Sequence, residues 1–216
     1  WLLEPQSTNL ITYSEDFSQW FNTRSSDSSG FISPTGGTNA TKFIADTTAS
    51  SSHIIKSTDI TISSGQTYTY SVFVKANQLN YVRLMFTDSA VSKYLSAYFN
   101  LSNGTVGTTS DGGTATLDSA NIESFGNGWY KCSVSGDLST ITTAHARIYL
   151  ADGDNSFSFN GDGTSGIYVF GAQVENQSFS TSYIPTSGAT NTRLQDIANN
   201  SGNSTLINST EGVLYA

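Results

Sequence analysis

Few residues of this chain have the types and spacing that catalysis requires. The two histidines, His53 and His145, lie far apart in the sequence and share no metal-ligand spacing. The chain has neither a Gly-x-Ser-x-Gly turn nor a His-Glu-x-x-His motif. Carboxylate pairs occur at positions 15–16 and 152–154, but both lie in predicted turns rather than in a closed cleft that would raise a pKa. We therefore predict a chain without a catalytic site.

Side chains that could bind a ligand stand out in four strand-like segments. The segments are Thr67–Lys75, Tyr81–Phe86, Tyr94–Leu101 and Ala146–Leu150. Successive side chains of a strand point to opposite sides, so in each segment an apolar set faces the core and the residues between them face outward. The outward side chains that we predict to bind a ligand are Phe73, Tyr81, Arg83, Tyr98, Arg147 and Tyr149.

Aromatic rings and arginines on the outer side of a sheet are typical of a sugar-binding groove. A flat ring packs on the apolar face of a pyranose, and a guanidinium binds hydroxyls or a carboxylate. Arg83 and Arg147 favour an acidic sugar, because a local charge outweighs the net charge at contact distance. The alternative is that a neighbouring domain or subunit covers this face, or that it is ordinary amphipathic surface.

The elements that must position these side chains are strands separated by turns rich in Gly, Asn and Asp. Ile167–Val174 has β-branched and aromatic residues on both faces, as a strand covered on each side requires. We predict a shorter strand at Phe179–Ile184, ended by Pro185, which has no N–H to donate. The turn at 127–128 predicts a hairpin. The predicted fold is all-β, a two-sheet antiparallel β-sandwich of jelly-roll type with almost no helix.

Composition and charge narrow the classes of ligand. The chain has 216 residues, 37% hydrophobic and 12% aromatic, enough for one all-β domain with a sizeable core. Its 17 acidic and 9 basic residues give a formal net charge of −8, which opposes binding to nucleic acid or to an anionic membrane. Neutral glycans, or contacts assisted by a cation, fit this charge better. The single cysteine, Cys132, alternates with apolar residues and is predicted to be a core side chain.

Three parts of the sequence carry a resemblance to a known kind of domain. They are LLEPQSTNLITYSEDFSQW at the start, FGNGWYKCSVS in the centre, and GDGTSGIYVFGAQVE with TSYIPTSGATNTR at the end. In this order they resemble a domain of phage tail and head-spike fibre proteins and of marine polysaccharide-degrading enzymes, which is similar to jelly-roll carbohydrate-binding modules. The resemblance covers nearly all of Leu2–Arg193. It implies a non-catalytic module that binds a polysaccharide or cell-surface glycan outside the cell, without indicating which glycan. It also implies that Trp129, which follows the turn at 127–128, is packed.

The resemblance also implies a structural calcium ion. Many similar modules hold calcium between an acidic residue near the first strand and an aspartate on the last strand. Here Glu15 and Asp16 would supply the first half of that site. The last strand offers Gly171, Ala172 and Gln173 where acidic residues would be expected. The alternative is that Glu15 and Asp16 are solvated carboxylates in a turn.

The expected domain organisation is a jelly-roll module over residues 1–193, a polar linker over 194–210 and the start of a following domain at 211–216. No signal peptide or membrane span is visible, and Trp1 is not a natural start, so we expect a piece of a longer, extracellular polypeptide. The polar segment Ser25–Thr41 is expected at the rim of the sandwich, where binding sites often lie.

The function that we predict is a carbohydrate-binding module that attaches a larger multidomain protein to cell-surface or algal polysaccharide. The alternative is a structural, oligomerising domain of a phage tail fibre or head spike, whose outward face packs against other subunits.

Overall fold

The computed structural model describes residues 3–197 of the chain. These residues form strands joined by turns, with one short 3-10 turn, η1 (Phe17–Gln19), and no other helix within the described part. The predicted antiparallel sandwich of jelly-roll type is therefore confirmed. The predicted linker beyond residue 197 and the predicted new domain at 211–216 lie outside the described residues.

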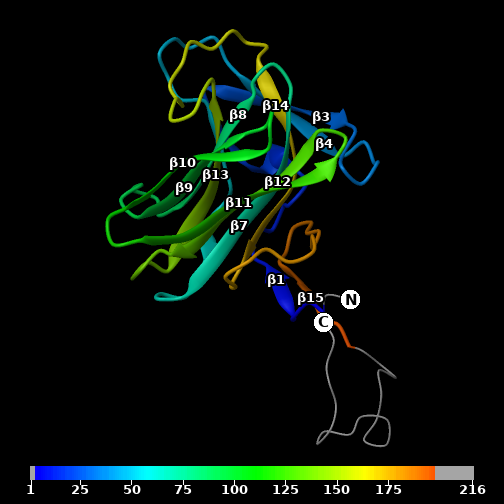
Figure 1. Cartoon of the computed structure of the whole chain (residues 1–216), viewed down its shortest axis with the longest axis vertical. Helices are drawn as coiled ribbons and strands as arrows, with labels where there is room; N and C mark the ends of the chain where they lie inside the picture. The colour runs from blue at the N-terminus through cyan, green and yellow to red at the C-terminus, as the bar shows by residue number, and fades with distance from the viewer. Residues whose placement is uncertain (1–2, 198–216) are drawn as a thin grey trace, which may run out of the picture.

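Two antiparallel sheets pack face to face (Figure 1). The six-stranded sheet has the order β11-β12-β7-β14-β4-β3, and its strands are β3 (Ser25–Phe31), β4 (Ala40–Ala45), β7 (Thr67–Ala76), β11 (Thr116–Gly126), β12 (Trp129–Asp137) and β14 (Gly166–Glu175). The seven-stranded sheet has the order β10-β9-β8-β13-β5-β2, with β6 also paired to β13. Its strands are β2 (Phe21–Thr23), β5 (Ile54–Lys56), β6 (Ile60–Thr61), β8 (Tyr81–Thr87), β9 (Tyr94–Asn100), β10 (Thr105–Gly112) and β13 (Thr143–Ala151).

The main core lies between the two sheets and follows the alternation of the sequence. In β7, the side chains of Tyr68, Tyr70, Val72 and Val74 all lie in this core, as predicted. Cys132 is a free, buried thiol in the same core, also as predicted. The removal of these apolar side chains from water is the main force that holds the sheets together.

A third, two-stranded sheet joins the two ends of the described chain. It consists of β1 (Ser7–Asn9) and β15 (Asn191–Arg193), which lie side by side at one end of the molecule (Figure 1). Arg193 Nη2 lies 3.0 Å from a carboxylate oxygen of Glu4, and the backbone N–H of Asp196 donates to the Glu4 carbonyl over 2.9 Å. We call this sheet and its flanking contacts the terminal clasp.

The strand predicted at Phe179–Ile184 does not form. This segment is a loop on the outer side of the six-stranded sheet, held by side chains of β14. The buried carboxylate of Glu175 accepts hydrogen bonds from the backbone N–H and the hydroxyl of Thr181. Gln173 Oε1 accepts from the N–H of Ile184 over 2.8 Å. Side chains thus supply the hydrogen bonds that a neighbouring strand would otherwise provide.

Candidate functional site

Three of the six predicted residues form one row across the outer side of the seven-stranded sheet. The register places Tyr149 of β13 opposite Arg83 of β8, and Arg83 opposite Tyr98 of β9. The guanidinium carbon of Arg83 lies 5.2 Å from the ring centre of Tyr149 and 5.4 Å from that of Tyr98. These distances permit cation–π attraction. We call these three residues the arginine row.

A loop covers the arginine row. The segment 152–159, which follows β13 and is called the strap here, passes over the sheet towards β10. The Phe157 ring centre lies 4.7 Å from the guanidinium carbon of Arg83. At the far side, the carboxylate of Asp154 accepts from the backbone N–H of Thr108 over 2.8 Å and from its hydroxyl over 2.9 Å. The strap is therefore fixed at both sides of the row.

Gly107 of β10 makes this position of the strap possible. A Cβ at residue 107 would collide with the carboxylate of Asp154. Under the strap, Arg83 is 8% exposed, Tyr98 2% and Tyr149 5%. A sugar ring cannot stack on side chains that are covered to this extent, so the arginine row is not an open groove.

The other three predicted residues do not join the arginine row. Arg147 and Tyr81 lie two positions along their strands, in neighbouring rows of the same sheet. Phe73 belongs to β7 of the six-stranded sheet and lies on the opposite side of the sandwich. The predicted single open face is therefore wrong, because the strap fills part of it and because outward side chains of β7 belong to a different sheet.

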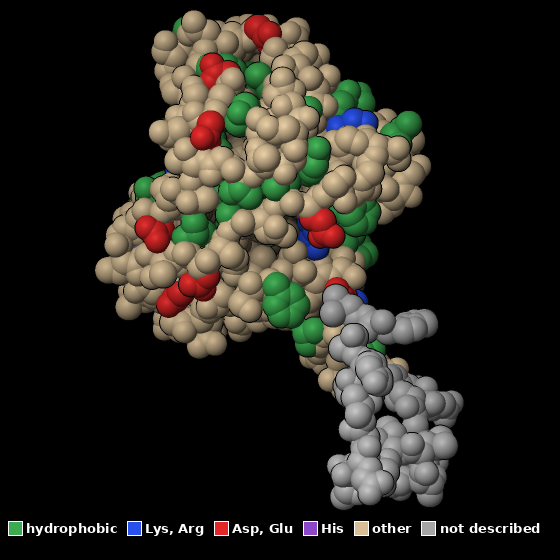
Figure 2. Space-filling model, viewed as in Figure 1, with side chains coloured by type: hydrophobic (Ala, Val, Ile, Leu, Met, Phe, Trp, Pro, Cys, Tyr) green, Lys and Arg blue, Asp and Glu red, His purple; other side chains and the backbone are tan. Residues whose placement is uncertain are grey.

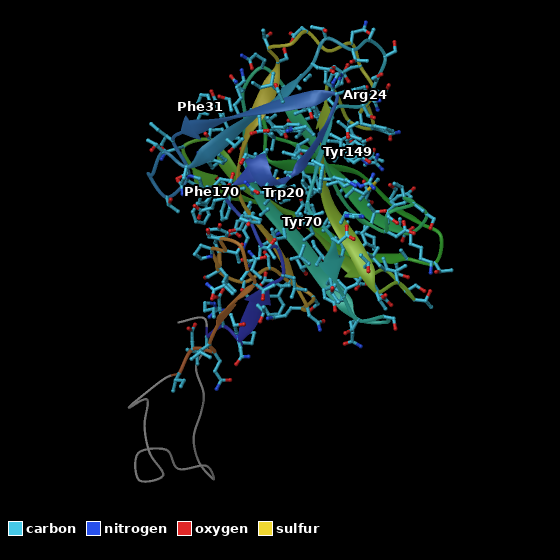
Figure 3. The ribbon with its side chains drawn as sticks, turned by 180° about the vertical axis from the view of Figure 1, so that it is seen from behind. Trp20, Arg24, Phe31, Tyr70, Tyr149 and Phe170 are labelled. Carbon is cyan, nitrogen blue, oxygen red and sulfur yellow. The ribbon has the colours of Figure 1, made fainter. Side chains whose placement is uncertain are left out.

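A second hydrophobic cluster lies on the outer side of the six-stranded sheet. Its buried members are Ala40, Phe73, Trp129 and Phe170, with the partly buried Phe31, Tyr168 and Tyr183 packed against them. Trp129 is only 2% exposed, so its predicted packing is confirmed. Figure 3 shows Phe31 and Phe170 on one side of the molecule and Tyr149 on the other.

A bulge in β14 allows Tyr183 to reach this cluster. The pairing of β14 with β7 shifts between Phe170 and Gln173, and Gly171 within the bulge has a φ of +62°. A Cβ at Gly171 would lie 3.1 Å from the rings of both Phe73 and Tyr183. Glycine therefore suits this position both for its backbone and for its lack of a side chain.

Two adjoining hollows beside the second cluster form the candidate site, which we call the aromatic trough. One, of about 230 Å³, is lined by Phe31, Ile32, Lys75 and Tyr168. The other, of about 510 Å³, is lined by Ile32, Ser33, Pro34, Thr35, Gly36, Lys75, Asn127 and Trp129. In Figure 2, hydrophobic and basic side chains gather at the right of the molecule, where β3 and β4 lie in Figure 1. The loop between these two strands forms one wall of the trough.

The aromatic trough combines a rigid apolar surface with a few polar groups. The rings of Phe31 and Tyr168 lie 5.0 Å apart between centres and are tilted by 50°. Among residues 3–197, Lys75 is the one charged side chain that lines the trough. The hydroxyls of Ser33 and Thr35 lie 2.9 Å apart, within hydrogen-bonding distance. This arrangement can pack against the flat face of a small ring and bond its polar substituents.

A more polar hollow of about 420 Å³ lies along β11 and β12 on the same side of the sandwich. It is lined by Thr69, Ser119, Ala120, Asn121, Glu123, Ser133, Ser135, Ser178, Phe179 and Ser180. Nearby, Lys131 Nζ donates to the carbonyl of Thr181 and lies 5.8 Å from the ring centre of Phe73. Burial lowers the pKa of Lys131, and the carboxylate of Glu175 opposes this effect.

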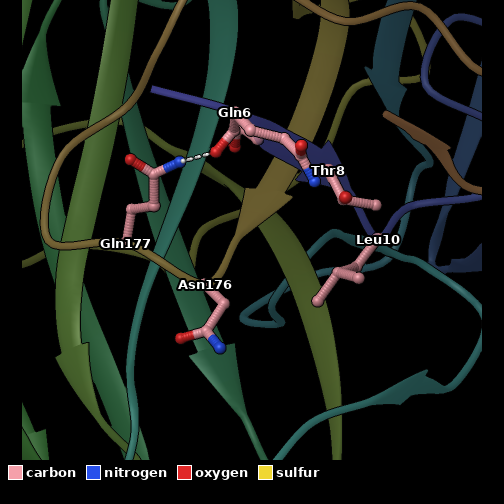
Figure 4. Close-up of a pocket in the computed structure, with 6 residues that line it drawn as sticks. Gln6, Thr8, Leu10, Asn176 and Gln177 are labelled. Atoms are coloured by element: carbon pink, nitrogen blue, oxygen red, sulfur yellow. Dashed lines mark hydrogen bonds between the residues drawn. The ribbon is translucent and has the colours of Figure 1, made fainter. Parts of the chain in front are cut away.

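A fourth, smaller hollow lies next to β1. It has a volume of about 160 Å³ and is lined by Gln6, Ser7, Thr8, Leu10, Asn176 and Gln177 (Figure 4). The amide of Gln177 donates to the carbonyl of Gln6 over 3.1 Å across it. The described residues that line it include no aromatic ring and no charged side chain, so they offer fewer means of recognition than the aromatic trough.

The acidic residues predicted to bind calcium have protein partners. Asp16 Oδ1 accepts from the backbone N–H and the hydroxyl of Ser18 at the start of η1. Glu15 accepts from the hydroxyl of Tyr183 over 3.0 Å and from the amide of Asn39 over 2.6 Å. No group of three or more His, Cys, Asp or Glu side chains within residues 3–197 is placed to hold a metal ion. Calcium at Glu15 and Asp16 stays a prediction.

The histidines lie apart, as their sequence positions predicted. His53 Nδ1 lies 3.4 Å from Asp46, and His145 Nδ1 lies 3.5 Å from Asp59. No nucleophile accompanies either pair in the contacts that the described residues make. These pairs therefore add no support for a reaction.

None of the six predicted binding residues lines the aromatic trough, so sequence reasoning missed its lining, including Phe31, Ile32, Lys75 and Tyr168. A signal was present, because Phe31 and Ile32 are apolar residues within the polar segment Ser25–Thr41, and Ile32 is 71% exposed. Tyr168 gave no such signal, since both faces of its strand are apolar in the sequence.

Among residues 3–197, the structure contains no helix that is long and apolar enough to cross a membrane.

Comparisons with known proteins found no matching family model and no matching curated protein. Among solved structures, the chain is similar to the CBM22-1–GH10 modules of the Clostridium thermocellum endo-1,4-β-D-xylanase 10B complexed with xylohexaose. The identity is 16% and the TM-score 0.45, over 84% of this chain and 30% of that one. It is also similar to TmCBM27, a carbohydrate-binding module described for specific mannan recognition, at 10% identity and a TM-score of 0.41, over 82% of this chain and 98% of that one. This chain thus spans less than a third of the xylanase structure, and at these scores neither likeness supports an inference about its ligand.

Proposed function

We propose that this chain is a non-catalytic carbohydrate-binding module that binds a glycan in the aromatic trough. The observation that carries the proposal is the lining of the trough, where the rings of Phe31 and Tyr168 adjoin Lys75 and the hydroxyls of Ser33 and Thr35. The module would attach a larger extracellular polypeptide to cell-surface or algal polysaccharide.

The physical basis of the proposal is the match between the trough and a pyranose ring. The apolar face of a sugar buries aromatic surface, which contributes most of the affinity, while hydroxyls exchange their water for protein partners at little net cost. Phe31 and Tyr168 are held by the second cluster, so little side-chain entropy is lost when a ligand binds.

The charge of the chain indicates which sugars suit the trough. With a net charge of −8 and one lysine lining the site, a neutral polysaccharide meets little repulsion there. A densely anionic polymer would meet the field of the acidic surface over a Debye length of about 8 Å at physiological salt.

The test is a glycan array followed by calorimetry with the glycan that the array identifies. We expect Tyr168→Ala and Phe31→Ala each to weaken binding by at least about fivefold, which corresponds to about 1 kcal/mol or more per stacking ring. Phe179→Ala is the matched control, because this phenyl ring is 52% exposed on the same side of the sandwich but lies outside the trough. Equal losses in all three variants, or none in the first two, would refute the trough as the site.

A second candidate function is a structural, oligomerising domain of a phage tail fibre or head spike. The observation that favours it is the exposure of Ile32 and Phe125, at 71% and 51%, because large apolar side chains at the surface often become covered by another subunit. The mass of the chain in solution separates the two functions. A stable oligomer that loses its subunit contacts in Ile32→Ser, with no glycan bound on the array, would favour the structural role.

A further inference from the structure

Two basic side chains lie next to each other on the outer side of the seven-stranded sheet. The register places Lys56 of β5 directly opposite Arg147 of β13, and Phe21 of β2 directly opposite Lys56. Residues directly opposite each other in an antiparallel pair point to the same side, with Cα atoms about 4.5–5.5 Å apart. Phe21, Lys56 and Arg147 therefore form a row on the side opposite to the aromatic trough, and we call them the basic row.

No carboxylate within residues 3–197 pairs with either cation of the basic row. The ion pairs of the described residues involve His53, His145 and Arg193 only. Arg147 Nη2 reaches the carbonyl of Ser89 at 3.5 Å, which is the long limit for a hydrogen bond, and Arg147 Nε is buried without any partner. The protein therefore leaves most of the hydrogen-bonding capacity of this guanidinium unused.

The carboxylate of Asp88 lies in the same loop as Ser89 but makes its hydrogen bonds within that loop and not with Arg147. Asp88, next to Ser89, accepts from the hydroxyl of Ser92 and from the backbone N–H groups of Ser92 and Lys93. These bonds lower its pKa against the opposing effect of burial, which is the largest single influence. Asp88 thus stays ionised to hold its own turn and forms no ion pair with Arg147.

The basic row lies between two covered parts of the sheet. On one side is the arginine row beneath the strap, two positions along β13 at Tyr149. On the other side is the loop after β8, where the Thr87 hydroxyl donates to the carbonyl of Lys93. Arg147 is only half-buried and Phe21 is 55% exposed, so the basic row remains accessible where its neighbours are not.

His145 lies two residues before Arg147 on β13, and its pKa responds to the charges around it. Burial lowers the pKa of His145, and the charges of Lys56 and Arg147 lower it further, while Asp59 opposes them. The field of Lys56 and Arg147 thus reaches His145, and the carboxylate of Asp59, 3.5 Å from its ring, offsets part of that field.

We propose that Lys56 and Arg147 bind one oxyanion, a sulfate or carboxylate group carried on a sugar, with Phe21 flanking that sugar. A guanidinium and an ammonium side by side match an oxyanion through charge-assisted hydrogen bonds. The ring of Phe21 lies 5.4 Å from Lys56 Nζ and offers an exposed apolar surface beside the charge. The basic row is separate from the aromatic trough, so this site can exist whether or not a neutral glycan binds there.

The test uses the full 216-residue chain with dextran sulfate, uncharged dextran and inorganic sulfate as probes, at constant ionic strength. We expect dextran sulfate to bind and dextran not to bind at the basic row. Arg147→Gln and Lys56→Gln should each weaken binding of dextran sulfate by about tenfold, the loss of a charge-assisted hydrogen bond. Lys42→Gln is the matched control, because this substitution removes the same charge from the other sheet. There, Lys42 Nζ donates to the carbonyl of Thr164.

Two spectroscopic measurements separate binding at the basic row from attraction by net charge and from binding in the aromatic trough. The side-chain resonance of Arg147 Nε–H and the titration of His145 should both shift when dextran sulfate is added, and Tyr168→Ala should leave these shifts unchanged. An equal loss of binding in Lys42→Gln would show that the polymer responds only to the net charge of the protein, and would contradict a specific site at the basic row. Binding of inorganic sulfate as tight as that of dextran sulfate would overturn its assignment to a sugar.

Discussion

The outer sides of the two sheets differ in what the connecting loops do to them. On the seven-stranded sheet, the strap places Phe157 and Asp154 over the arginine row and removes it from solvent. On the six-stranded sheet, Tyr183 covers Phe73 and Phe170, but the loop between β3 and β4 stands beside Phe31 and Tyr168 and leaves a trough. Both sides carry outward aromatic side chains, so the difference lies in the loops. Outward-facing rings therefore indicate a binding surface only where no loop returns to cover them.

Of the substitutions that test this difference between the two sheets, Trp129→Ala should have the largest effect on stability. Because this ring is 2% exposed and packs with Phe73 and Phe170, Trp129→Ala should lower the free energy of unfolding by about 3–5 kcal/mol in urea denaturation. The control is Phe125→Ala, since that ring is 51% exposed and contacts Phe73 edge-on at 4.9 Å. Its expected loss is about 1 kcal/mol. Equal losses would mean that the second cluster is not packed like a core.

A substitution at Gly107, which lies against the strap, should have the next largest effect on stability. Gly107→Val should displace the carboxylate of Asp154 from Thr108, at a cost of about 1–2 kcal/mol for the lost charge-assisted bonds. Hydrogen exchange should show a faster Thr108 amide, and the arginine row should become reachable. Val106→Ala, at the neighbouring residue, is the control. A Thr108 amide as slow as in the parent would show that other contacts hold the strap.

A smaller, pH-dependent effect should appear on the seven-stranded sheet. Burial holds the pKa of His145 below its ordinary value of 6.5, so the unfolded chain takes up the proton first as the pH falls. Stability that this group contributes above pH 6.5 is therefore lost as the pH falls from there through the lower pKa of the folded state. The melting temperature should decrease less between pH 7 and pH 5 in His145→Gln than in the parent. A larger decrease in the variant would contradict this sign.

The smallest expected effect concerns calcium near Glu15 and Asp16. An ion that binds only the folded chain raises its melting temperature by mass action. Calcium added after EDTA should then produce a small rise in the parent that Asp16→Asn lacks. An unchanged melting temperature in the parent would leave both carboxylates with only the hydrogen bonds to Ser18, Tyr183 and Asn39.

The sequence predicted the sandwich well because alternation with period two is a local property. The inward set of β7 and the burial of Cys132 both follow from it. The packing of Trp129 in the outer cluster does not, and was expected from the resemblance alone. Alternation could not show that Phe73 and Arg83 belong to different sheets, because the order of strands depends on pairings between distant segments. It also could not show that the strap returns over Arg83, because that position depends on Asp154 meeting Thr108.

The strand wrongly predicted at Phe179–Ile184 has a similar cause. Its residues have the composition of a strand, but the Gln173 and Glu175 side chains of β14 bind its backbone from the side. Local composition cannot distinguish these partners from a neighbouring strand, because both satisfy the same N–H groups.

The terminal clasp has a mechanical consequence. Ser7 pairs with Arg193, and Asn9 with Asn191, so the chain enters β1 and leaves β15 at the same end of the pair. A force that pulls the two ends apart therefore loads the hydrogen bonds between Glu4 and Asp196 first. The ion pair of Glu4 and Arg193 follows, and then one backbone pair at a time. Such unzipping needs less force than sliding whole strands past each other. Under tension the clasp should open as a short extension step, while the sheets of the sandwich still carry no load.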